Sequence, residues 1–135
     1  MKKIVLIDSS YPINTRNARI YQSLVKSSSV FVISWDRNNT SRIKKEDSYI
    51  LYKDKAEYGN KIQKLKKLHL YYSFVKQKVL EISPDIIIAS HWDMLLITLI
   101  LKKYILENNI EIIYDVLDMP DSNSLILNKI VDLLE

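Results

Sequence analysis

The sequence contains no cysteine, which excludes a disulfide framework and a zinc site built on thiolates. Its two histidines, His69 and His91, are too few for us to expect a histidine-based metal site. No apolar run approaches the roughly 20 residues that a membrane-spanning helix needs. The first residues lack the long apolar region and small-residue cleavage site of a signal peptide. We therefore expect a cytoplasmic protein without a resident metal.

Glycine is almost absent as well, since Gly59 is the single glycine in the chain. The dinucleotide-binding fingerprint and the P-loop both need several glycines, which bring backbone amides close to phosphate groups. The sequence therefore carries neither motif, and we expect no tightly bound cofactor.

Charge and composition set the remaining bounds. The chain has 135 residues, of which 47% are hydrophobic, and a formal net charge of +4. This length suits one globular domain with a real core. The small basic excess is compatible with an anionic ligand or surface but gives no reason to expect nucleic acid as a partner.

Short apolar runs alternate with segments of helical periodicity along the chain. The runs predict strands at 3–8, 30–35, 48–52, 85–89 and 111–116, and the periodicity predicts helices at about 15–26, 60–82, 94–106 and from 124 onward. The long central helix is expected to bury a stripe of apolar residues: Ile62, Leu65, Leu68, Tyr72, Val75 and Val79.

The strands at 4–7 and 86–89 are apolar at every position, which is typical of strands buried on both faces. Such strands occur in parallel sheets that are covered by helices on both sides. With right-handed crossovers, we predict an α/β fold with a doubly wound, Rossmann-like parallel sheet of about five strands, in the order 3-2-1-4-5.

Polar residues follow the strands at the edge where such sheets bind ligands, beyond the carboxyl ends of the strands. The candidates for lining a cleft there are Ser9, Ser10, Asn14, Arg16, Asp36, Arg37, Ser90, His91, Asp93 and Asp118. An acid/base group next to cations and hydroxyls suits chemistry on a sugar or a phosphate.

Several of these residues have structural alternatives. Asp93 is well placed to cap the helix that follows it, and His91 could be a hydrogen-bonded structural histidine. Trp35 and Trp92 are expected to serve in packing. His69, within the long helix, is expected to be a surface residue.

The long helix is also rich in lysine, at Lys61, Lys64, Lys66 and Lys67. The simplest reading is a solvated helix face. The alternative is peripheral contact of residues 60–80 with an anionic membrane at the inner face, because Leu70, Tyr71 and Phe74 form a second apolar patch beside the lysines.

Four segments in order resemble the N-terminal domain of GT-B fold glycosyltransferases, of the group-1 (family 4) kind used in bacterial surface polysaccharide assembly. They are TRNARIYQSL, VFVISWDRN, PDIIIASHWDMLLITLILKK and IIYDVLDMPDS, and together they span most of the chain. The residues that fall on family motif positions are Arg16, Trp35, Asp36, Arg37, Tyr114, Asp115 and Asp118.

The position of the family histidine allows two alignments. Without a gap, Ser90 falls on that histidine, His91 on the acidic position after it, and Asp93 on the second family aspartate. A shift by one residue places His91 on the histidine, which in relatives lies near the sugar and the phosphates. The resemblance therefore makes His91 the candidate catalytic residue, with Ser90 as the alternative occupant of that position.

The resemblance implies a two-domain enzyme, of which residues 1–135 form the single N-terminal, acceptor-binding domain. A C-terminal domain, absent from this sequence, would bind the nucleoside diphosphate sugar, and no metal would be needed. Sugar would pass to a saccharide or lipid-linked acceptor, and this domain alone would be inactive. The apolar stripe Ile126, Ile130, Leu133 and Leu134, which runs up to the last residues, also leads us to expect further chain.

A different reading stays open on the sequence alone. The start KIVLIDSS is similar to the first strand of a receiver domain, so a non-catalytic, flavodoxin-like or receiver-like module that binds a small ligand or a protein is the alternative. A receiver also needs an aspartate after its third strand and a lysine after its fifth. Asp54 is only a loose candidate for the first, and no lysine directly follows the fifth predicted strand.

Overall fold

The computed structural model describes residues 1–38, 47–56 and 59–115 of the chain. Asp118 and the helix expected from residue 124 onward lie outside these described residues.

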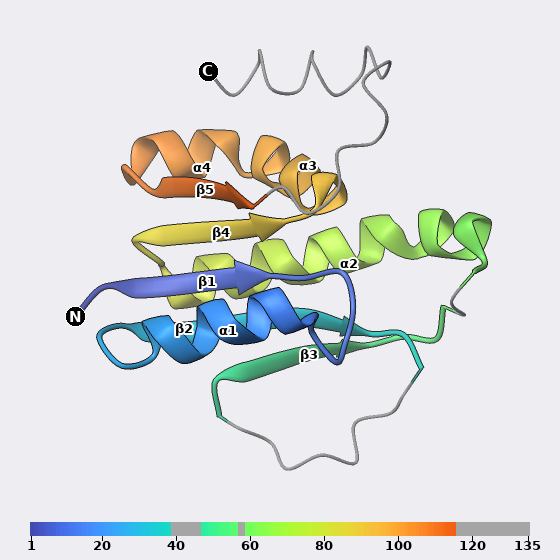
Figure 1. Ribbon diagram of the computed structural model, residues 1–135. Coiled ribbons are helices and arrows are strands. Elements are labelled where there is room, and N and C mark those ends of the chain that lie inside the picture. Colours follow the sequence, from blue (N-terminus) through green and yellow to red (C-terminus); the bar gives the residue numbers. More distant parts are fainter. Residues whose placement is uncertain (39–46, 57–58, 116–135) are drawn as a thin grey trace.

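The described residues form five strands and four helices (Figure 1). The elements are β1 (Lys3–Ile7), α1 (Thr15–Leu24), β2 (Ser29–Asp36), β3 (Tyr49–Lys53), α2 (Lys61–Ile82), β4 (Ile86–Ser90), α3 (Trp92–Ile100), α4 (Lys102–Glu107) and β5 (Glu111–Asp115). All pairings are parallel, and the strand order is β3-β2-β1-β4-β5. The predicted Rossmann-like α/β fold is confirmed.

The strands are in a register that brings their carboxyl ends level. Ile7 at the end of β1 pairs with Ile33 of β2 on one side and with Ala89 of β4 on the other. The residues that follow these three positions, among them Asp8 and Ser90, therefore meet at one edge of the sheet.

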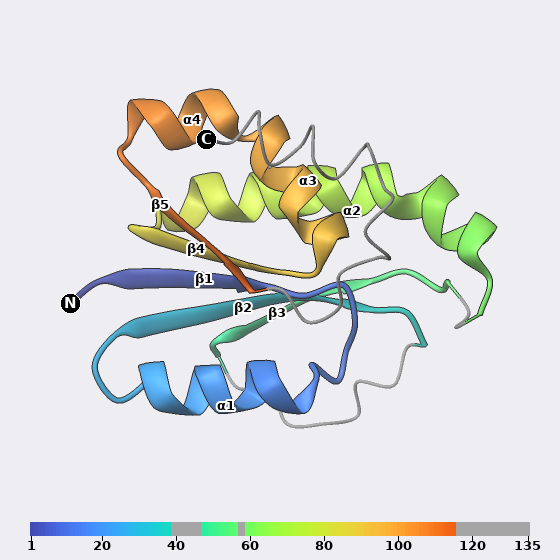
Figure 2. The same cartoon turned by 45° about the horizontal axis from the view of Figure 1, so that its top comes forward.

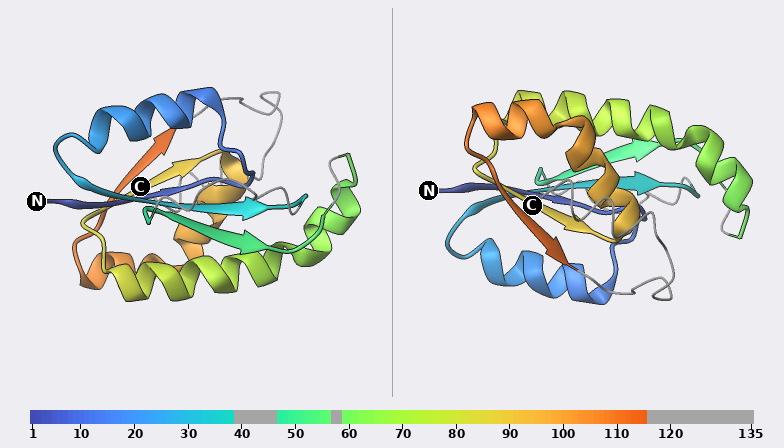
Figure 3. Two further views of the ribbon diagram at one scale, coloured as in Figure 1. Left: turned by 90° about the horizontal axis from the view of Figure 1, so that it is seen from below. Right: turned by 90° about the horizontal axis from the view of Figure 1, so that it is seen from above.

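The sheet is covered on both faces, as Figures 2 and 3 show: α1 lies against one face, and α2, α3 and α4 lie against the other. Val5 and Ile87 point into the larger core beneath α2–α4, whereas Leu6 and Ile88 point into the smaller core beneath α1. This two-sided burial explains why β1 and β4 are apolar at every central position. Within the described part of the chain, no helix is both long enough and apolar enough to cross a membrane.

The predicted helix at 94–106 is two shorter helices, and its predicted cap is wrong. The structure starts α3 at Trp92, so Asp93 lies in the first turn and His91 occupies the N-cap position without a side-chain capping bond. Leu101 separates α3 from α4, and the two helices run in different directions (Figure 2). The change of direction serves packing, because the side chains of Leu101 and Ile105 both reach the larger core.

The apolar stripe predicted for α2 is correct only in its later turns. Leu68 is buried with 8% exposure, but Ile62 and Leu65 are 69% and 68% exposed. The reason is that the first turns of α2 extend past the edge of the sheet, where no described strand lies under Ile62 and Leu65 (Figure 1). In the next turns Tyr71 is fully buried and Tyr72 half-buried, so the buried face is rotated from the predicted one.

We predict that two leucines one turn apart on α2 differ sharply in their contribution to stability. Leu68→Ala should lower the free energy of unfolding by about 2–5 kcal/mol because it leaves a cavity in the core. Leu65→Ala should change it by less than about 0.5 kcal/mol, as is usual at exposed positions. Urea denaturation of both variants measures this, and equal losses would contradict the observed projection of the first turns of α2 past the sheet.

Candidate functional site

A buried carboxylate organises the edge of the sheet at the end of β1. Asp8 is fully buried. Its Oδ1 accepts hydrogen bonds from the backbone N of Ser10 at 3.1 Å and from the Ser10 hydroxyl at 3.3 Å. Its Oδ2 accepts from the Asn17 amide at 2.6 Å and from the Asn14 amide at 3.4 Å. Burial of an anion is costly unless donors surround it, so these bonds fix the loop from β1 to α1.

Asn17 extends this hydrogen-bonded chain to β4. The hydroxyl of the buried Ser90 donates to Asn17 Oδ1 at 2.8 Å, while the Asn17 amide nitrogen donates to Asp8. Asn14 caps α1, since its Oδ1 accepts from the backbone N of Asn17 at 2.8 Å. One asparagine therefore joins β1, α1 and β4.

Asn17 is not among the residues predicted for the site, although the sequence carries a signal for it. Asn17 lies four residues before Tyr21 and seven before Leu24, so it shares their face of α1, and both pack against the smaller core. A fully polar side chain on the buried stripe of a helix indicates a hydrogen-bonding partner inside.

Two further hydroxyls hold the backbone around Asp8. The Tyr71 hydroxyl on α2 donates to the backbone carbonyl of Asp8, and the Ser34 hydroxyl on β2 donates to that of Ser10. Burial raises the pKa of Tyr71 well above its ordinary value, and the nearby charges of Asp8 and Asp93 raise it further. Tyr71 thus remains a neutral donor.

His91 has the most unusual backbone at this edge. It follows Ser90 directly and has φ 72° and ψ 155°, a combination that is nearly exclusive to glycine. Within the described residues its half-buried imidazole makes no hydrogen bond. A strained backbone that carries an unpaired imidazole is the kind of feature that occurs at functional sites, where the surroundings hold the strain.

On the C-terminal side of His91, side chains of α2 fix the backbone. The carboxylate of the buried Asp93 accepts from the Lys64 ammonium at 2.7 Å, and the Tyr72 hydroxyl donates to the backbone carbonyl of Asp93. Burial, followed by the charge of Asp93, raises the pKa of Tyr72, so this tyrosine also stays a neutral donor. The first turn of α3 is therefore fastened to α2 immediately after the strained residue.

Arg16 lies at the rim of the site. Its guanidinium forms an ion pair with Asp115 at the end of β5, and the Arg16 side chain is still 53% exposed. The other carboxyl oxygen of Asp115 is buried without a hydrogen-bond partner among the residues that the structure describes. The start of α1 is thus joined to the last strand of the sheet.

Asp36 and Arg37 are buried at the end of β2, and Arg37 serves a different region. Arg37 Nε donates to the backbone carbonyl of Ala56 at 2.9 Å, and Ala56 N donates to the carbonyl of Arg37 at 3.0 Å. Trp35 Nε1 donates to the carbonyl of Asp54 at 2.9 Å. These bonds attach the segment after β3 to β2, so the Nε of Arg37 is committed to a backbone contact.

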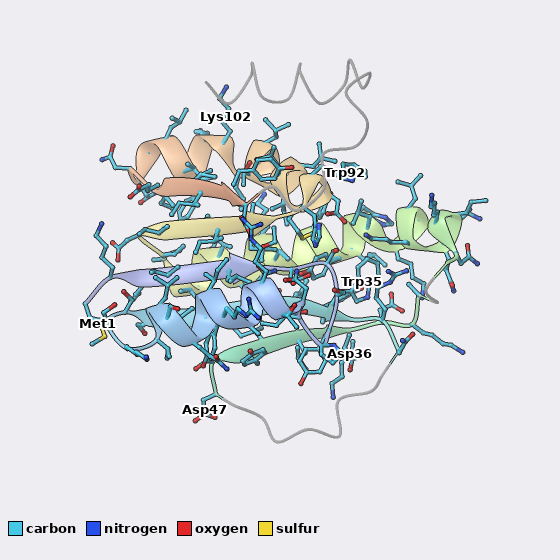
Figure 4. The ribbon with its side chains drawn as sticks, in the orientation of Figure 1. Met1, Trp35, Asp36, Asp47, Trp92 and Lys102 are labelled. Atoms are coloured by element: carbon cyan, nitrogen blue, oxygen red, sulfur yellow. The ribbon has the colours of Figure 1, made fainter. Side chains whose placement is uncertain are left out.

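The structure therefore divides the predicted site residues into groups. Ser10, Asn14 and Ser90 surround or adjoin the Asp8–Asn17 pair, and His91 and Asp93 follow Ser90 directly. Arg16 stands at the rim, and Ser9 is buried beside Asp8. Asp36 and Arg37 lie beside β3, and Asp118 is not among the described residues. Trp92, expected from the sequence to serve in packing, is 44% exposed at the start of α3 (Figure 4).

This edge combines hydroxyls, amides, a guanidinium and an imidazole above the ends of β1 and β4. Such groups suit hydrogen bonding to a ligand rich in hydroxyls or phosphate oxygens. Among the described residues, no group of three or more side chains is arranged to hold a metal ion. No protein-family model matches the chain, and no curated protein matches it either.

We predict that glycine at position 91 gives a more stable protein than alanine. His91→Gly removes the penalty of the positive φ, whereas His91→Ala keeps it, so His91→Gly should be more stable by about 1 kcal/mol or more. Urea denaturation measures the difference.

Ser73, exposed in the middle of α2, supplies the matched control. There the order should reverse, with Ser73→Ala more stable than Ser73→Gly by about 1 kcal/mol, as in any helix interior. The same order at both positions would mean that the backbone of His91 is not strained.

Proposed function

We propose that this domain is the acceptor-binding half of a GT-B glycosyltransferase that moves sugar from a nucleoside diphosphate sugar to a saccharide or lipid-linked acceptor. The observation that carries the proposal is the strained backbone and the position of His91. Its imidazole, which has no hydrogen-bond partner among the described residues, follows β4, and the strand order reverses between β1 and β4. Ligands of open α/β sheets bind at this reversal, outside the carboxyl ends of the strands.

In this proposal His91 acts on the reacting groups as an acid/base or as a hydrogen-bond donor. Imidazole suits this role because its ring nitrogens can both donate and accept a proton. Ser10 and Asn14, in the loop after β1, would bind acceptor hydroxyls, and the exposed part of Arg16 would face negative charge.

The donor would be held by a second domain, with helix N-termini and basic groups stabilising the departing diphosphate. Transfer would take place between the two domains, on the cytoplasmic side of the membrane where surface polysaccharides are assembled. The domain alone would bind acceptor without turning it over.

The strand order supports this proposal over the alternative module. Flavodoxin and receiver domains have the order 2-1-3-4-5, whereas this sheet has β3-β2-β1-β4-β5. The observed order is shared by many Rossmann-like proteins, so the choice among them rests on the sequence resemblance and on His91.

The test compares the two histidines in the complete two-domain enzyme, with release of nucleoside diphosphate from a panel of nucleotide sugars as the assay and bacterial membranes as the acceptor source. His91→Ala should lower kcat by about 100-fold or more, the usual loss for an acid/base group. His69→Ala, at an exposed position of α2, should leave turnover unchanged.

Thermal melting of both variants is the control for folding: both should melt near the wild-type temperature, so that the loss of turnover in His91→Ala reflects the chemistry. Equal turnover in His91→Ala and wild type would remove His91 from the mechanism, and no diphosphate release from any donor would contradict the proposal itself.

A further inference from the structure

The first turns of α2 expose two large aliphatic side chains side by side. Ile62 and Leu65 lie one turn apart and are 69% and 68% exposed. Lys61 and Lys66 flank them, and both are exposed. We call these four residues the α2 tip. Exposed aliphatic residues that lie together on a helix and are bordered by lysines are typical of surfaces that bind a membrane interface.

The lysines of α2 fall into two sets. Lys64 pairs with Asp93 at 2.7 Å, Lys67 with Asp54 at 2.6 Å, and Lys78 with Glu81 at 2.7 Å. Lys61, Lys66 and Lys76 have no ion pair within the described part of the chain, and of these three only Lys61 and Lys66 lie in the first turns. The unpaired positive charges of the first turns are thus concentrated at the tip, beside the exposed aliphatic residues.

The position of the tip adds to this picture. The start of α2 projects past the carboxyl ends of the strands in every view (Figures 1 and 3). It therefore projects from the same end of the molecule as His91 and Ser10, and no described element covers it. The second apolar patch predicted from the sequence does not form, because Tyr71 is fully buried.

We propose that the α2 tip docks on an anionic lipid bilayer, with Ile62 and Leu65 inserted among the acyl chains and Lys61 and Lys66 at the headgroups. The charge of the tip distinguishes an anionic membrane from a second copy of the chain as its binding partner. The tip has lysines and no acidic residue, so a second copy of this face would be repelled, whereas an anionic surface is attracted. Docking of the tip does not depend on the proposed transferase activity.

The expected contributions are measurable. Each lysine near an anionic surface strengthens binding by roughly fivefold, and each aliphatic side chain that becomes buried strengthens it by about tenfold or more. The lysine part should weaken at high salt because salt screens surface charges.

The experiment measures sedimentation of the purified chain with vesicles of phosphatidylcholine, with and without about 30% phosphatidylglycerol, which gives a strongly negative surface. The wild-type chain should bind the anionic vesicles and not the neutral ones. The double variants Ile62→Ser/Leu65→Ser and Lys61→Glu/Lys66→Glu should each lose about tenfold or more in affinity.

Matched controls separate the tip from general charge and hydrophobicity. Ile100→Ser/Leu106→Ser alters two residues of α3 and α4 that are also more than half exposed, and Lys2→Glu/Lys26→Glu makes the same change in net charge elsewhere. Both should bind anionic vesicles within about twofold of wild type. All these positions are exposed, so the melting curves should superimpose.

Three results would overturn the proposal: no binding of the wild type to anionic vesicles, equal losses in tip and control variants, or self-association that Ile62→Ser/Leu65→Ser abolishes. The last result, measured by light scattering, would assign the tip to contact between copies of the chain.

Discussion

The buried carboxylate of Asp8 is the constraint on which this end of the molecule depends. A fully buried anion needs several donors, and here Ser10, Asn14 and Asn17 supply them from a loop and a helix that are adjacent in the sequence. The need to satisfy Asp8 thus determines how the chain leaves β1 and where α1 begins. Because Asn17 also accepts from Ser90, the same constraint fixes the end of β4.

His91 lies between two fixed points. Ser90 before it is tied to Asn17, and Asp93 after it is tied to Lys64 and Tyr72 of α2. The chain must turn from strand to helix in one residue, because β4 ends at Ser90 and α3 begins directly after His91. This explains how a non-glycine residue is kept at φ 72°. Strain of this kind is retained where several other interactions determine the local structure. The strained backbone places His91 at the edge of the sheet.

The fold could be predicted from the sequence because burial on both faces requires an unbroken apolar run, as at 4–7 and 86–89. The site could be predicted less completely. Asp93 looked like a cap, since a polar residue before an apolar run usually is one, but its position next to Lys64 depends on a contact between distant segments. Leu65 fitted the helical stripe, and nothing local indicated that the sheet ends before it. Arg37 was assigned to the cleft by its place after a strand, whereas its partner Ala56 is set by the pairing of β2 with β3.

The most direct test of the Asp8 constraint is the pH dependence of stability in Asn17→Asp. When the introduced carboxyl is protonated, it can donate to Asp8 and accept from Ser90, as the amide does. When it is ionised, two like charges meet in a buried site, so its pKa is raised above the unfolded value of roughly 3.9. The folded state then binds more protons than the unfolded state. The variant should therefore match wild type below about pH 4 and lose up to about 1.4 kcal/mol of unfolding free energy per pH unit above it. A constant difference between the variant and wild type from about pH 4 to about pH 8 would contradict the central role of Asp8.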